Sequence, residues 1–194
     1  MKKSRLEAFS DGVLAIIITI MVLELKGPHE PTLSALWPLW PKILSYLMSF
    51  VVIGIYWNNH HHLWQVVEHV KGSVLWANLH LLFWLSLVPF VTAWMGENQF
   101  AAVPVALYGV VLLGSGCAYY IMVRLLLASH ANDSLLARAM GSDFKGRISI
   151  WLYLIGIGVA FFWPWLAGVL YGVVSVIWLV PDRRIEKLIS PSAR

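Results

Sequence analysis

Long apolar runs dominate this sequence and restrict what it can fold into. The first run, RLEAFSDGVLAIIITIMVLEL from Arg5 to Leu25, is long enough for one helix to cross a lipid bilayer. Of the 194 residues, 59% are hydrophobic and 12% are charged, whereas a soluble domain carries about 25% charged residues. The sequence therefore predicts an all-α integral membrane protein whose surroundings are the lipid bilayer.

Polar residues and helix breakers separate six expected membrane spans within one domain, residues 1–194. The spans are 6–26, 42–64, 74–95, 101–127, 147–163 and 165–180. Only Pro164 separates the last two, which have a second interpretation as one kinked helix or a tight hairpin. The segment 30–42 contains Pro31, Pro38 and Pro41, so we expect it to be a loop at the membrane interface.

The basic residues predict the orientation of the spans, because cytoplasmic loops of membrane proteins are enriched in Lys and Arg. With the N-terminus inside, six spans place all of the 14 Lys and Arg residues except Lys26 and Lys42 on the cytoplasmic side. Five spans would leave the basic C-terminal tail outside. We therefore expect both termini in the cytoplasm, and topology accounts for the net charge of +4 without a nucleic-acid partner.

Ionisable and amide side chains gather near the cytoplasmic ends of the first three expected spans. They are Asp11, the stretch YWNNHHHLW from Tyr56 to Trp64, and the stretch WANLH from Trp76 to His80. At a shared depth these groups can pair with one another, since buried polar groups need partners. A structural network between helices and a proton relay are the two interpretations.

The same stretch gives little support to a metal site or to an enzyme. Three consecutive histidines point to different sides of a helix, no two histidines have i, i+4 spacing, and Cys117 is the only cysteine. The sequence contains no P-loop, no HExxH, no TVGYG filter and no recognisable nucleophile–base arrangement. We expect no metal, no cofactor and no catalytic residues.

The helical phase of the first span separates Asp11 from an apolar stripe. At ~100° per residue, Ile16, Ile20 and Leu23 lie on one side with Thr19 beside them, and Asp11 lies ~140° from Ile16. Asp11 is therefore expected to point towards spans two and three. Periodicity alone is also compatible with a stripe that faces lipid or the core, since aliphatic residues cover every side of this helix.

The residues Arg5, Phe9, Ser10 and Asp11 form R-x-x-x-F-S-D at the start of the first span. This motif resembles the signature of the transmembrane protein 175 family of potassium channels, found in endosomes and lysosomes of animals and in bacteria. One six-span unit with both termini inside is similar to the bacterial form. The resemblance implies a homotetramer in the bacterial plasma membrane, with potassium as the permeant ion and the first span lining a central pore.

The resemblance also implies roles for individual residues. Ile16 takes the filter position, Ile20 and Leu23 add apolar layers, and Thr19 matches a polar position just beyond the constriction. Arg5 and Asp11 of the motif, with Phe9 and Ser10, would belong to a hydrogen-bond network that reaches spans two and three. The candidate partners there are Asn58, Asn59, His60, His61, His62, Asn78 and His80.

Two other classes of protein stay open at this point. A proton-coupled secondary transporter would use Asp11 and the histidines as a relay, and it would couple flux to protons at a fixed ratio. A membrane scaffold would show no flux.

Overall fold

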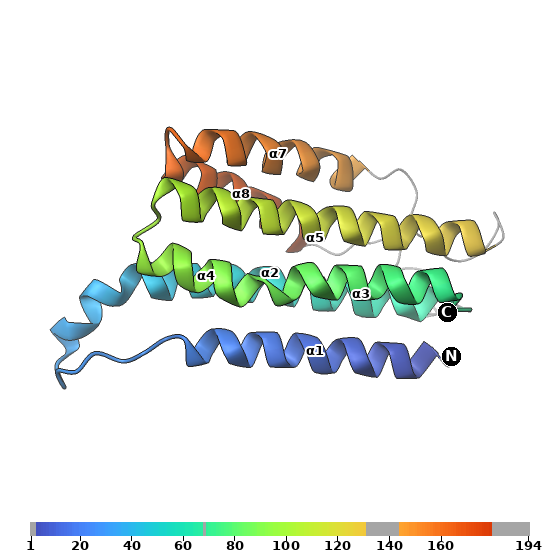
Figure 1. Ribbon diagram of the computed structural model, residues 1–194, viewed down its shortest axis with the longest axis horizontal. Coiled ribbons are helices and arrows are strands. Elements are labelled where there is room, and N and C mark those ends of the chain that lie inside the picture. The colour runs from blue at the N-terminus through green and yellow to red at the C-terminus, as the bar shows by residue number, and fades with distance from the viewer. Residues whose placement is uncertain (1–2, 68, 131–143, 180–194) are drawn as a thin grey trace, which may run out of the picture.

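The computed structural model describes residues 3–67, 69–130 and 144–179, and every regular element in these ranges is a helix (Figure 1). The long helices lie side by side along one axis and alternate in direction. The all-α prediction is confirmed. The elements are α1 (Lys3–Leu23), the 3₁₀ helix η1 (Leu33–Leu39), α2 (Trp40–Val66), α3 (Gly72–Ser86), α4 (Val88–Glu97), α5 (Ala102–Ser129), α7 (Phe144–Ala160) and α8 (Pro164–Leu179).

Proline marks the boundaries of several of these helices. Pro89 has no backbone N–H and interrupts the hydrogen-bond ladder between α3 and α4. Leu87 between them stays in the right-handed helical region, and the Val91 amide donates to its carbonyl at 3.2 Å. The two helices therefore continue in one direction and together fill the expected third span. The segment 30–42 is not, as expected, a loop throughout, because it contains η1 and the first turn of α2, where Pro41 lies.

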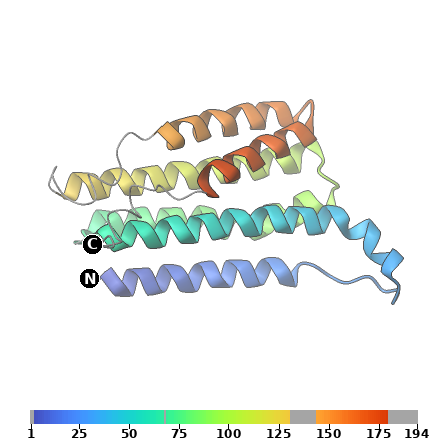
Figure 2. The same ribbon diagram turned by 180° about the vertical axis from the view of Figure 1, so that it is seen from behind.

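Four helical segments of the described chain have the length and composition to cross a membrane: Lys3–Leu23, Leu33–Val66, Gly72–Glu97 and Ala102–Ser129. Helices α7 and α8 are shorter, with 17 and 16 residues, or ~26 and ~24 Å at 1.5 Å per residue. They are two helices that form a hairpin through residues 161–163, and not one kinked helix (Figure 2). Val180, the last residue of the expected sixth span, lies outside the described residues.

An aromatic stack joins three elements at the end of the bundle where α2, α5 and α8 begin. Phe100 is buried in the turn before α5, and its ring lies 4.6 Å from that of Trp165 between centroids. Trp165 in turn stacks on Trp40 of α2 at 5.5 Å. Gln99 and Phe100 have φ values of 51° and 59°, which are uncommon for residues other than glycine. Burial of the Phe100 ring between tryptophans offsets the strain of this turn.

Hydroxyl groups link the helices inside the bundle. Ser49 of α2 lies 2.6 Å from Thr92 of α4 and 3.1 Å from Tyr108 of α5, measured between oxygens. All three side chains are buried. Bonds of this kind join membrane helices, because lipid offers their polar groups no alternative partner.

Two glycines make room for a buried tyrosine between α5, α7 and α8. The Tyr171 ring of α8 fills the space beside Gly109 of α5 and Gly156 of α7. A Cβ atom at either glycine would overlap this ring. The position of the α7–α8 hairpin on α5 therefore depends on small residues facing Tyr171.

We expect Gly156→Ala to destabilise the protein by about 1–3 kcal/mol, because the added methyl group overpacks the Tyr171 site. Gly158→Ala is the matched control, since Gly158 lies on the same helix with no neighbour within 4 Å of its Cβ position. Both changes raise helix propensity equally, so thermal unfolding in detergent isolates the clash. Equal melting temperatures for the two variants would contradict this account.

Candidate functional site: the uncovered face of the first helix

Helix α1 lies at the edge of the bundle and packs one side against α2, α3 and α4 (Figure 1). Its buried side chains are those of Leu6, Ser10, Leu14, Ile17 and Met21. This spacing of three and four residues keeps them on one face of the helix. The opposite side of α1 has no cover within the described chain.

The apolar stripe expected from helical phase lies on this uncovered side. Ile16 is 58% exposed, Ile20 is 42% exposed and Leu23 is 75% exposed. Phe9 is also exposed, about two helical turns before Ile16. Thr19 is exposed beside the stripe, and its hydroxyl donates to the Ile16 carbonyl at 2.8 Å. A large apolar surface on a single chain marks a site of contact with lipid or with another protein.

A buried chain of hydrogen bonds joins the N-terminal half of α1 to α3 and, through Asn78, to α2. Asn78 of α3 donates from Nδ2 to Ser10 Oγ at 2.9 Å, and its Oδ1 lies 2.8 Å from His60 Nε2. Ser10 itself donates to the Leu6 carbonyl at 2.9 Å. Ser10 and Asn78 are fully buried. The FSD motif is therefore hydrogen-bonded to α3 through its serine, and Asn78 extends the chain to α2.

His60 is the junction of this chain and has two neighbours at one nitrogen. Trp64 Nε1 also lies 2.8 Å from His60 Nε2. An indole N–H only donates and an amide oxygen only accepts, so Nε2 cannot serve both contacts in one protonation state. With the proton on Nε2, His60 donates to Asn78 Oδ1; with the proton on Nδ1, Nε2 accepts from Trp64 Nε1. Either neutral form leaves buried groups unpaired, because Nδ1 has no partner and one of the two contacts at Nε2 is lost. The Trp64 ring lies edge-on to the imidazole.

Asp11 makes no hydrogen bond within the described chain, and its Oδ1 is buried. The expected bonds from Asp11 to spans two and three are not formed in this single chain, and Ser10 occupies that place instead. Ser10 lies at the centre of the buried face of α1, whereas Asp11 lies ~100° further around the helix.

A second polar chain lies nearer the N-terminus of α1 and includes a residue that sequence reasoning missed. Glu7 Oε1 lies 3.2 Å from His61 Nδ1, and His61 Nε2 lies 2.8 Å from Gln65 Nε2. Trp57 stacks on the His61 ring. Glu7 lies one helical turn before Asp11 and could have been found by its i, i+4 spacing.

The other candidate residues do not join these two chains. Asn59 donates to the Ile55 carbonyl, His80 accepts from Trp84 Nε1 at 3.0 Å, and His62 Nδ1 is buried without a partner. Arg5 is exposed and Asn58 is half-buried, and no hydrogen bond joins either of them to the described residues. Across the described ranges, no group of three or more His, Cys, Asp or Glu could hold a metal ion.

Known proteins are similar to this chain in sequence and in fold. The family described as endosomal/lysosomal potassium channel TMEM175 matches residues 5–89. A potassium channel of Chryseobacterium sp. (strain P1-3) is 55% identical over 187 residues, which cover 96% of this chain and 97% of that protein.

A solved structure and an animal protein are also similar. The crystal structure of a lysosomal potassium-selective channel TMEM175 homolog from Chamaesiphon minutus has a TM-score of 0.78 and 29% identity, and covers 91% of this chain and 96% of that one. The endosomal/lysosomal proton channel TMEM175 of Danio rerio is 29% identical over 64% of this chain and 23% of that protein. The resemblance drawn from R-x-x-x-F-S-D is thus confirmed, and this integral membrane protein belongs to the TMEM175 channel family.

Proposed function

We propose that this protein is a potassium-selective or potassium-leak channel of the bacterial plasma membrane. Four chains would assemble around a central pore lined by α1, and Ile16, Thr19, Ile20 and Leu23 would form its filter and gate. The observation that carries the proposal is the uncovered apolar face of α1. Relatives named potassium channels and a structural neighbour named potassium-selective support the choice of ion.

The proposed topology has six spans and both termini in the cytoplasm. With α3 and α4 taken as one span, successive helices alternate in direction. The described basic residues at one end of the bundle are therefore Lys3, Arg5, Lys71, Arg124, Lys145 and Arg147, and those at the other end are Lys26 and Lys42. This distribution agrees with the positive-inside rule. Lys2, Arg138, Arg183, Arg184, Lys187 and Arg194 lie outside the described residues.

The proposed mechanism rests on rings of apolar side chains. Ile16, Ile20 and Leu23 from four chains would form three rings within ~10.5 Å, from 1.5 Å of rise per residue. A narrow apolar tube can lose its water and close, and a modest tilt of the helices would reopen it. Potassium is more weakly hydrated than sodium, so it would enter such a ring at lower cost. The rings offer no ligands, so selectivity would be modest.

The buried but unpaired Asp11 oxygen supports assembly from more than one chain. A buried carboxyl oxygen without a hydrogen-bond partner is costly, and a neighbouring subunit could supply the missing donor. A single α1 cannot enclose a pore, so the proposal requires an oligomer. Within each chain, the Ser10–Asn78–His60 bonds would hold α1 at the angle that turns Ile16 to the axis.

The second candidate is a proton-coupled transporter that uses Asp11 and the histidines. Unpaired buried atoms of Asp11, His60 and His62 favour it. Purified protein in liposomes separates the two candidates. A channel gives a current that reverses at the potassium equilibrium potential, and a coupled transporter gives a reversal potential that shifts with the proton gradient at fixed potassium.

We predict that Ile16→Asn lowers the preference for potassium over sodium towards equal permeation, because an amide wets the narrowest ring. Val22→Asn is the control, since Val22 is also an exposed aliphatic residue of α1 but lies away from the stripe. Bi-ionic reversal potentials in liposomes measure the ratio. An unchanged ratio in Ile16→Asn would remove Ile16 from the filter.

We predict that Asp11→Ala mainly weakens assembly, because it leaves groups of a neighbouring chain without a partner. The oligomeric mass in detergent, measured by light scattering, should fall from four chains towards one. A stable tetramer of Asp11→Ala without ion flux would instead indicate a direct role for Asp11 in transport.

We predict that Asn78→Leu destabilises the fold by about 1–3 kcal/mol, because it strands the buried Ser10 and His60 side chains. Asn58→Leu serves as the control, since Asn58 lies at a similar depth without a hydrogen bond to the described residues. Chemical unfolding in mild detergent gives the free energy of unfolding. Similar losses for both variants would show that the Asn78 bonds contribute little.

A further inference from the structure

Two arginines lie on the surface of α5 and α7, at the edge of the bundle opposite α1 (Figure 1). They are Arg124 of α5 and Arg147 of α7, and both side chains are exposed. Neither guanidinium group forms a hydrogen bond or an ion pair with the described residues. Helices α5, α7 and α8 contain no Asp or Glu that could neutralise these charges. Two positive charges therefore face the surroundings of the protein.

Both arginines lie on the same side of the α5–α7 pair, away from α8. Trp178 of α8 marks the other side, because it packs edge-on against Tyr119 of α5 and donates from Nε1 to Ser149 of α7. At ~100° per residue, Arg124 lies ~140° around α5 from Tyr119, and Arg147 lies ~160° around α7 from Ser149. The two arginines therefore share the face of this pair that α8 leaves open.

The two arginines also lie close together along the helix axes. A Cβ atom at Gly109 of α5 would meet the Ile157 side chain of α7, and the two helices run in opposite directions. Arg147, ten residues before Ile157, therefore comes level with residue 119 of α5. Arg124 is five residues further along α5, or ~7.5 Å at 1.5 Å per residue. Long arginine side chains on neighbouring helices can reach one ligand across this distance.

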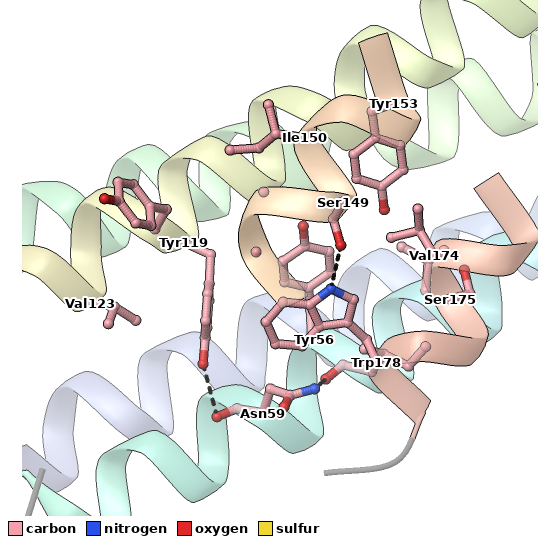
Figure 3. A pocket seen from close by; sticks show the side chains of 15 residues that line it. Tyr56, Asn59, Tyr119, Val123, Ser149, Ile150, Tyr153, Val174, Ser175 and Trp178 are labelled. Atoms are coloured by element: carbon pink, nitrogen blue, oxygen red, sulfur yellow. Dashed lines mark hydrogen bonds between the residues drawn. The ribbon is translucent and has the colours of Figure 1, made fainter. Parts of the chain in front are cut away.

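A small cavity lies between the helices beside the two arginines (Figure 3). Its lining includes Val123, which precedes Arg124, and Gly146, which precedes Arg147. Its volume of about 80 Å³ leaves room for only a few water molecules. A ligand of the arginines therefore binds on the outer surface of α5 and α7 and not inside the bundle.

An exposed aromatic ring accompanies each arginine. Tyr120 lies four residues before Arg124, and Trp151 lies four residues after Arg147, so each ring is on the same face of its helix as the arginine. Because α5 and α7 run in opposite directions, both rings lie one turn further from the end of the bundle than the arginines. Aromatic rings with basic residues beyond them are typical of a membrane–water interface. The arginines therefore lie at the depth of lipid headgroups.

We propose that Arg124 and Arg147 together bind the phosphate of an anionic membrane phospholipid, whose acyl chains lie along Tyr120 and Trp151. Guanidinium groups match the geometry of phosphate through paired N–H donors. Two positive charges without an acidic neighbour in these helices favour a headgroup of net negative charge over a zwitterionic one. The site needs a single chain and no pore, so its test does not depend on the proposed channel function.

The test is native mass spectrometry of the purified full-length protein, titrated with phosphatidylglycerol or with phosphatidylcholine of the same acyl chains. The first phosphatidylglycerol should bind at a lower lipid concentration than the first phosphatidylcholine, and an excess of inorganic phosphate should not displace it. Equal binding of the two lipids would overturn the proposal. Displacement by inorganic phosphate would also overturn it, because the site would then bind a free anion and not a lipid.

Variants locate the bound lipid. Arg124→Gln and Arg147→Gln should each weaken binding of the first phosphatidylglycerol about fivefold, the effect of one basic residue near an anionic headgroup. Arg5→Gln is the matched control, since Arg5 is also an exposed arginine at the same end of the bundle but lies on α1 at the opposite edge. Phosphatidylglycerol binding that stays unchanged in either Arg124→Gln or Arg147→Gln would contradict a shared site. An equal loss in Arg5→Gln would show that binding follows total charge, and it would overturn the proposal.

Discussion

The hydrogen bond from Asn78 to Ser10 fixes which side of α1 faces the bundle. Ser10 lies at the centre of a face otherwise made of Leu6, Leu14, Ile17 and Met21, so packing and hydrogen bonding select the same rotation of the helix. A rotation by one residue would bury Asp11 at this place and expose Ser10. The polar bond specifies the rotation, because a purely aliphatic helix surrounded by lipid could pack in several ways.

Once this rotation is set, Ile16 and Leu23 are left on the outer side of α1. In a single chain this apolar surface would face lipid, and in the proposed assembly it would line the pore. The proposed assembly would also offer a neighbouring chain as the partner for the unpaired Asp11 oxygen. Where α1 meets α2 and α3, Ser10 is thus hydrogen-bonded within the chain, whereas the neighbouring Asp11 Oδ1 has no partner.

The sequence was sufficient to predict the helical class, most helix limits and the stripe on α1, because all three follow from hydrophobic length and from the 3.6-residue period. It included Asn78 among several candidate partners of the FSD motif but did not single it out, and it assigned the contact to Asp11 and not to Ser10. Phase alone turns both Ser10 and Asp11 away from Ile16, and only the positions of α2 and α3 separate the two. The repeated residues from Asn58 to His62 hid the register in the same way: His60 is the buried member, while His61 pairs with Glu7 on a partly exposed surface. The sequence also could not predict the packing of Tyr171, since this packing requires glycines from two other helices.

The central claim is that the uncovered face of α1 lines a water-filled pathway between four chains. The single cysteine allows a direct measurement, in which Ile16→Cys and Leu14→Cys are each placed in a Cys117→Ser background. A charged, water-soluble thiosulfonate reagent is then added during potassium flux from liposomes. The account predicts rapid modification and loss of flux for Ile16→Cys, with no effect on Leu14→Cys, whose side chain faces the bundle. An Ile16→Cys channel that conducts unchanged and remains unmodified would contradict it.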